Sequence, residues 1–296
     1  MQYNDSSLIL NLPSLNQPII NQSLRTLLGG QTIGQSLVSA AHTIPKDYIT
    51  HSLHSYFLLP GNDDLPILYH VERLHDGTSF LTRRVTAQQL GRVIFAMSVS
   101  FHRPESGFEH QLDPPQVPSV SETKSMSEMM REWQQLPNVP EHIKRNLIKS
   151  AEMPFPIDIR RVSPPTIKER LVATGCKEQI TWMRVNGCLR SFELSIDRRI
   201  LHQCAIAYMS DWSLLETACV PHGIHLWLNS PQEYLQMASL DHAMYFHCDF
   251  RADEWLLYVM NSPRASQARG LAIGHFYDQR GQLIVTAGQV TDELLL

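Results

Sequence analysis

An acidic residue lies where a helix would otherwise bury an apolar side chain. In RRILHQCAIAYMSDWSLLETACV, residues 198–220, apolar side chains recur at steps of three and four and define one face of a long helix. Asp211 falls on that face, where a carboxylate is costly unless it is hydrogen-bonded or reaches a cleft. Two interpretations stay open: a structural Asp satisfied by amides or an arginine, or a general base at the edge of a pocket.

A glutamine interrupts a second apolar pattern. The segment QLIVTAGQV, residues 282–290, reads as the last strand of the chain, and Gln289 occupies a position where an apolar residue is expected. Aligning the two halves of the chain places Val99 at the equivalent position. The Gln and Val pair suggests one working site and one degenerate site. The alternative is that Gln289 is simply exposed near the end of the chain.

A third polar group occurs in ASLDHAMYFHCDF, residues 238–250, which otherwise reads as a buried strand. An unbulged strand places Ser239 and Asp241 on one face and His242 on the other. His242 and His247 are also on opposite faces, so they do not share a metal ion without a bulge. A serine in a strand is usually inert, so the position of Ser239 alone says little about chemistry.

The elements that carry these residues suggest an α+β unit that occurs twice. HSYF (54–57) parallels HAMYF (242–246), and LGRVIFAMSV parallels RGQLIVTAGQ, although any two antiparallel sheets share such features. We expect an N-terminal unit over 1–105 with a degenerate site, and a C-terminal unit over 169–296. Between them, 106–168 is expected to be a proline-rich connector with short helices and no strand alternation. The first unit is expected to contain a helix at 29–43 and strands at 51–59, 66–74, 79–85 and 92–101; the second, strands at 179–187, 236–250, 254–262, 268–278 and 282–290 around the 198–220 helix.

Composition excludes several classes of protein. The net charge of −4 gives no basic field for nucleic acid, and no apolar run approaches the length of a membrane span. The sequence contains neither a Gly-rich nucleotide loop nor a G-x-S-x-G nucleophile elbow. The five cysteines form no C-x-x-C pair, and no His spacing completes a zinc pattern, so no metal site is predicted. An odd cysteine count without a signal peptide favours an intracellular, reducing compartment.

Several longer strings resemble a known family. GGQTIGQSL, HSLHSYFLLPG, PILYHVERLHDGTSFLTRRV and GRVIFAMSVSF resemble the N-terminal half of type II acyl-CoA thioesterases, and AYMSD, SLDHAMYFH, RADEWLLY and SPRASQARGL resemble the C-terminal half. The resemblance covers roughly residues 27 to 102 and 178 to 290. It implies a double hotdog fold, in which two antiparallel sheets each wrap around a long central helix. It also implies hydrolysis of medium- to long-chain fatty acyl-CoA to fatty acid and CoA.

Position by position, the resemblance implies a catalytic trio of Asp211 in AYMSD, Ser239 in ASLDH and Gln289 in TAGQV. Asp211 would act as the general base for a water that Gln289 and Ser239 hold. The family usually continues Q-E-G after the glutamine, whereas this chain has Q-V-T. Arginines at strand ends are candidates for the CoA phosphates, although such arginines are more often plain surface residues. These candidates are Arg83, Arg84, Arg264 and Arg269.

Neither a metal nor a separate cofactor is expected, because CoA is part of the substrate. Two other functions are considered. A hotdog enoyl-CoA hydratase or dehydratase pairs its Asp with a His five residues later, but Glu216 stands there in this chain. A non-catalytic acyl-CoA binder would not need the trio. The expected compartment is the cytoplasm or the peroxisome, the latter without an S-K-L signal, and the protein is a possible homo-oligomer.

Overall fold

A computed structural model describes residues 29–137, 139, 141–152, 155–162, 178–189, 196–222 and 235–295. The first 28 residues of the predicted N-terminal unit, and the predicted boundary between connector and C-terminal unit near 168, lie outside the described residues.

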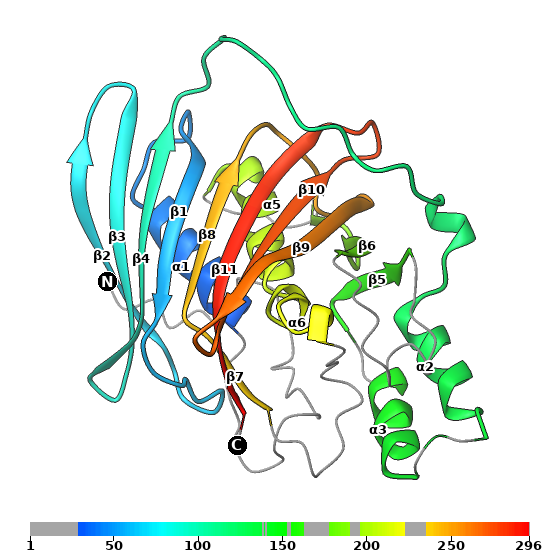
Figure 1. The fold of residues 1–296 in the computed structure, drawn as a ribbon. Helices are drawn as coiled ribbons and strands as arrows, with labels where there is room; N and C mark the ends of the chain where they lie inside the picture. The colour runs from blue at the N-terminus through cyan, green and yellow to red at the C-terminus, as the bar shows by residue number, and fades with distance from the viewer. Residues whose placement is uncertain are drawn as a thin grey trace.

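The described strands form one continuous antiparallel sheet with the order β2-β3-β4-β1-β8-β11-β10-β9-β6-β5, and β7 pairs with β11 (Figure 1). The strands are β1 (Ile49–Phe57), β2 (Leu68–Asp76), β3 (Phe80–Gln89), β4 (Arg92–His102), β5 (Ile157–Arg161), β6 (Glu178–Val185), β7 (Leu235–Ser239), β8 (Asp241–Phe246), β9 (Leu256–Ser266), β10 (Arg269–Tyr277) and β11 (Leu283–Leu295). The two halves meet where β1 pairs with β8, from Ser52↔Tyr245 to Tyr56↔Asp241. The sheets of the two units are therefore joined edge to edge.

Two helices of 13 residues each, α1 (Gly29–Ala41) and α5 (Arg198–Ser210), lie side by side against this sheet (Figure 1). They run antiparallel, and α1 approaches α5 closely. A Cβ atom added to Gly30 would lie 2.6 Å from the carbonyl oxygen of Tyr208, and one added to Gly34 would lie 3.1 Å from that of Cys204. The small residues of α1 thus let it pack directly on the backbone of α5. This arrangement confirms the predicted double hotdog.

The predicted helix over 198–220 is wrong in its length. It is broken after α5, and a short helix α6 (Leu214–Thr217) and a 3-10 turn η3 (Val220–His222) follow. The break occurs because Ser213 adopts a left-handed conformation with φ of 68°, which no α-helix continues through. Helix α1 packs against β2, β3 and β4. In the second half, the break divides the contacts: α5 contacts β1, and α6 contacts β9, β10 and β11.

The prediction that the connector contains no strand is also wrong. Beyond the short elements η1 (Val120–Glu122), α2 (Met126–Gln134) and α3 (Glu141–Glu152), the connector contributes β5, which pairs with β6. The inward-facing Ile157 and Ile159 are both 3% exposed. The alternation in PIDIRRV is too short to stand out between prolines.

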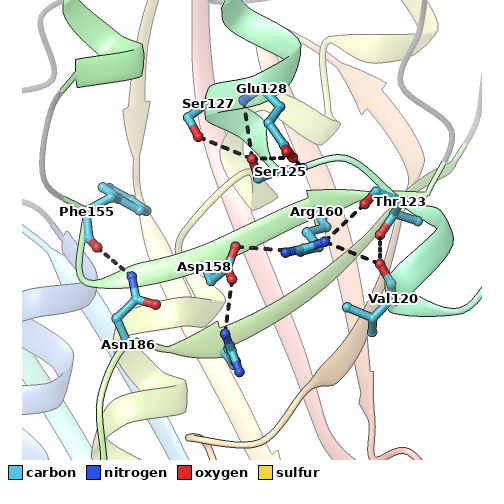
Figure 2. A network of polar contacts seen from close by, with 10 residues as sticks. Val120, Thr123, Ser125, Ser127, Glu128, Phe155, Asp158, Arg160 and Asn186 are labelled. Carbon is cyan, nitrogen blue, oxygen red and sulfur yellow. Dashed lines mark hydrogen bonds and ion pairs between the residues drawn. The ribbon is translucent and has the colours of Figure 1, made fainter.

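Polar contacts hold the part of the connector that precedes α2 against β5 and the neighbouring strand β6 (Figure 2). A guanidinium nitrogen of Arg160 donates to the carbonyl oxygens of Val120 and Thr123 at 3.5 and 3.1 Å. Trp182 of β6 donates its indole N–H to the carbonyl oxygen of Pro118 at 3.0 Å. Val120 packs beside Trp182 in a small apolar cluster on this part of the sheet. The connector is therefore built into the C-terminal unit, and it covers part of the sheet there.

Among the described helices, none combines the length and apolar character that crossing a bilayer requires.

Candidate active site

Asp211 caps the C-terminal end of α5, where the partial negative charge of its own helix opposes a carboxylate. The start of α1 offsets this cost. The backbone N–H of Gly30 donates to Asp211 Oδ2 at 2.8 Å, and a helix N-terminus carries partial positive charge. A Cβ on Gly29 would lie 3.0 Å from the same oxygen, so the paired glycines leave room for the carboxylate. Asp211 is half-buried.

Gln289 joins Asp211 to Ser239. Its side chain is fully buried at 0% exposure, on the inner face of β11. Its amide nitrogen donates to Asp211 Oδ1 at 3.2 Å and to Ser239 Oγ at 2.5 Å. Three side chains that are far apart in the sequence therefore converge on one point between α5, β7 and β11. The alternative of an exposed Gln289 is wrong.

The strand predicted over 236–250 contains a break that changes which residues share a face. β7 ends at Ser239 and β8 begins at Asp241, with Leu240 between them. Both Ser239 and His242 contact the side chain of Gln289, although an unbulged strand would separate them. The predicted assignment of faces is therefore wrong, and the sequence pattern contained no signal for this break.

Asp241 supports the break. β8 pairs with β11 as far as Gly288, and β7 pairs from Thr291 onward, so the ladder is interrupted between them. The Asp241 carboxylate accepts the backbone N–H of Val290 at 2.7 Å and takes the place of a strand partner. Asp241 therefore has a structural role at this break.

The carboxylate of Asp211 influences the buried groups around it. Burial and the nearby Asp211 charge raise the pKa of the Tyr208 and Tyr258 phenols, so both stay neutral hydroxyls. Burial lowers the pKa of His242, an effect that Asp211 and Asp241 only partly oppose, so its imidazole is neutral near pH 7. Asp211 is thus surrounded by uncharged groups and by a helix N-terminus.

The N-terminal half has apolar residues at the equivalent positions. Phe57 pairs with Phe95 as Phe246 pairs with Val285. Four residues further along each final strand, Val99 corresponds to Gln289. Leu53 on β1 pairs with Val99 on β4. It corresponds to His242 and is 0% exposed. The two halves therefore differ here: the equivalent side chains are an apolar pair in the N-terminal half and a hydrogen-bonded polar pair in the C-terminal half.

Arg83 has a structural role. It points to the inner face of β3 and is 1% exposed. Its guanidinium donates to the side chain and carbonyl of Thr43, to the carbonyls of His75 and Thr82, and to Asp76. All its nitrogens are engaged, so we withdraw the prediction that it contacts a CoA phosphate.

The other candidate arginines are exposed and separated from one another. Arg84 lies on the outer face of β3, and four strand spacings separate β3 from β11, or about 19 Å. Arg264 and Arg269 flank the β9–β10 turn, and Arg269 donates to Gln267 at 3.1 Å. Arg269 is three residues along β10 from Ala272, the partner of Gln289, or about 10 Å. Along the sheet, this second pair is therefore nearer the trio than Arg84, but the odd spacing places Arg269 on the opposite face of β10 from Ala272.

Glu216 points away from the trio. Its Oε2 lies 3.4 Å from a guanidinium nitrogen of Arg161 on β5, and both side chains are buried, at 3% and 4% exposure. Arg161 also donates to Gln179 at 3.0 Å. The position that a hydratase would give to histidine is therefore part of a buried ion pair with the connector. Among the described residues, no group of three His, Cys, Asp or Glu is placed to hold a metal ion.

Comparisons with known proteins agree with this fold. A family model described as acyl-CoA thioesterase matches residues 152–292, and one described as acyl-CoA thioesterase N-terminal domain matches residues 20–102. Acyl-coenzyme A thioesterase 8 of Mus musculus is 36% identical over 288 residues, covering 95% of this chain and 86% of that protein. Acyl-CoA thioesterase 2 of Haemophilus influenzae is 35% identical over 265 residues, covering 90% and 86%.

A solved structure extends the match to three dimensions. The acyl-CoA thioesterase II TesB2 from Mycobacterium marinum superposes with a TM-score of 0.68 at 36% identity, over 90% of this chain and 89% of that one. Fold and site thus define a thioester hydrolase of the double hotdog class. The chain belongs to the acyl-CoA thioesterase family, in its type II branch.

Proposed function

We propose that this protein hydrolyses medium- to long-chain fatty acyl-CoA to fatty acid and CoA by direct attack of water, with Asp211, Ser239 and Gln289 as the catalytic residues. The observation that carries the proposal is the convergence of these three side chains on the amide nitrogen of Gln289. The family membership supplies the thioester substrate.

Asp211 is the general base in this proposal. Its Oδ2 accepts the N–H of Gly30, and its Oδ1, which accepts an N–H of Gln289, has a second lone pair with which to take a proton from water. Gln289 and Ser239 hold the water in line with the thioester carbon. Fixing the nucleophile in this way can remove several kcal/mol from the barrier.

The proton and electron balance needs no other reactant. The water oxygen bonds to the carbonyl carbon as Asp211 takes its proton, and the carbon–sulfur bond then breaks. CoA leaves as a thiolate, whose ordinary pKa of about 8.5 makes it a good leaving group, and it recovers a proton from Asp211 or solvent. We therefore propose that neither metal nor cofactor takes part. Arg264 and Arg269 are our remaining candidates for the CoA phosphates, since they lie nearest the trio.

Incubation with three groups of substrate tests the function. Saturated acyl-CoA of short, medium and long chain should release thiol, detected with a disulfide reagent and corrected for the exposed Cys188 by a substrate-free blank. An unsaturated enoyl-CoA should not lose its double-bond absorbance before thiol appears. Hydration without thiol release would support a hydratase, and saturable binding without turnover would support a carrier; either result overturns the proposal. An aliquot treated with a chelator should keep its rate.

A further inference from the structure

His242 is a buried polar side chain that the reaction above leaves without a task. It is 0% exposed, on the inner face of β8. Its Nδ1 lies 3.1 Å from Gln289 Oε1, and its Nε2 lies 2.9 Å from Ser210 Oγ. Ser210 immediately precedes Asp211, and its carbonyl oxygen accepts the Tyr258 hydroxyl at 2.9 Å. His242 therefore connects β11 to the end of α5, the two elements that hold Gln289 and Asp211.

The donors and acceptors along the hydrogen-bonded series from Asp211 through Gln289 and His242 to Ser210 determine one another. A carboxylate only accepts hydrogen bonds, so Gln289 must present its amide nitrogen to Asp211, and its oxygen then faces His242. An amide oxygen also only accepts, so Nδ1 of His242 carries the proton. Because the buried imidazole is neutral, Nε2 then has a lone pair that accepts the hydroxyl proton of Ser210, in competition with the carbonyl oxygen of Ala207, which lies 3.0 Å from the same hydroxyl.

The opposite amide orientation is disfavoured at the Asp211 end. It would place the oxygen of Gln289 against Asp211 Oδ1, with acceptor facing acceptor at 3.2 Å. It would also require the Nε2–H tautomer of His242, with the Ser210 hydroxyl donating to the carbonyl oxygen of Ala207. In the N-terminal half, Leu53 and Val99 make up the equivalent pair and have no donor or acceptor in their side chains.

We propose that His242, as its Nδ1–H tautomer, is a positioning residue that fixes the amide of Gln289 with its N–H groups toward Asp211 and Ser239. Its effect on turnover rests on the proposed function, because the amide so fixed is the one that holds the water. Asp211 and Asp241 are the charged groups that face the imidazole, and both are acceptors, so neither competes with Nδ1 for the oxygen of Gln289.

Three variants separate positioning from packing. His242→Asn keeps an N–H donor near the place of Nδ1, His242→Gln reaches the place of Nε2 instead, and His242→Leu installs the residue of the N-terminal half. We expect His242→Asn to stay near the wild-type kcat. His242→Gln and His242→Leu should lower kcat by about 10- to 100-fold with little change in KM.

A packing role predicts the opposite order, since asparagine fills the least space and would be the most damaging replacement. If both kcat and melting temperature are lowest for His242→Asn among the three variants, the proposal is overturned. Because His242 acts through Gln289, adding His242→Leu to Gln289→Ala should cost little further activity. Full additivity of the two losses would contradict that mechanism.

Nitrogen NMR of histidine-labelled protein near pH 7 tests the tautomer without turnover. The ring signal lost in His242→Asn should report a protonated Nδ1 and an unprotonated Nε2; the reverse tautomer overturns the inference. If the protein is active but His242 has the reverse tautomer, the proposed function stands and this inference is wrong. An inactive protein with the Nδ1–H tautomer refutes the function and supports the orientation of Gln289.

Discussion

At the scale of single residues, the carboxylate of Asp211 lies between two helix ends of opposite polarity. Its own helix α5 ends there, and α1 begins there with the N–H of Gly30 at 2.8 Å. A general base needs a carboxylate that is held in place and still has one oxygen facing its substrate. The contact with Gly30 restrains one oxygen, and Gln289 marks the direction of the other.

Replacing Ser239 tests whether it holds water or attacks the substrate itself. Ser239→Ala should lower kcat by about tenfold, the loss of one hydrogen bond, whereas Ser239→Thr keeps the hydroxyl and most of the activity. Mass spectrometry of rapidly quenched reactions should show unmodified protein. An acyl group covalently attached to Ser239, together with an inactive Ser239→Ala variant, would replace direct water attack by a covalent mechanism.

Two of the three trio residues were predictable from physical reasoning about the sequence. Asp211 and Gln289 are polar residues on apolar patterns, and such residues need a reason to be there. Ser239 was identified only by family resemblance, because a serine in a strand costs little. His242 lies on the buried face that alternation gave it, but Ser239 was wrongly placed on the opposite face, since the break at Leu240 depends on the partner strand β11 and not on local sequence.

At the scale of elements, the site depends on how closely α1 approaches α5. The small residues of GGQTIGQSL let this helix lie close against another layer. The sequence did not show that the layer would be the helix of the other unit, because that contact joins residues more than 170 positions apart. The end of α5 was also missed, because the left-handed Ser213 is an unusual conformation for a non-glycine residue.

Gly30→Ala tests this close contact. The new Cβ would lie 2.6 Å from the carbonyl oxygen of Tyr208, so α1 has to move away from α5. Overpacking of this kind costs about 1–3 kcal/mol, and the movement also weakens the bond to Asp211, so both melting temperature and kcat should fall. Gly107→Ala is the matched control, since its Cβ would meet no atom within 4 Å. Equal stability of the two variants would contradict the packing described.

At the scale of the whole molecule, the connector is part of the C-terminal unit. Its strand β5 extends the sheet, and Arg161 on that strand reaches Glu216 in α6, five residues after Asp211. The composition of this segment predicted a connector without strands, because its density of prolines obscured the short alternation of β5. Tertiary pairing with β6 supplies what local alternation lacks.

The buried ion pair makes this integration measurable. Arg161→Met removes the cation beside a carboxylate that is 3% exposed, so unfolding free energy should fall by about 3–5 kcal/mol. Removing both charges in Arg161→Met/Glu216→Met should recover much of that loss, because no isolated charge remains buried. Denaturant unfolding of the four proteins in the cycle gives the comparison. A double variant less stable than Arg161→Met would show that the pair is not coupled.

The most direct measurement of the central claim is the rate of thiol release from a long-chain acyl-CoA by Asp211→Asn. Asparagine preserves the shape of the side chain and an oxygen for the N–H of Gly30, but it cannot take a proton from water. We predict that kcat falls by at least about 100-fold while the melting temperature stays close to that of the wild type. A variant that folds normally and turns over at the wild-type rate would contradict the assignment of Asp211 as the base.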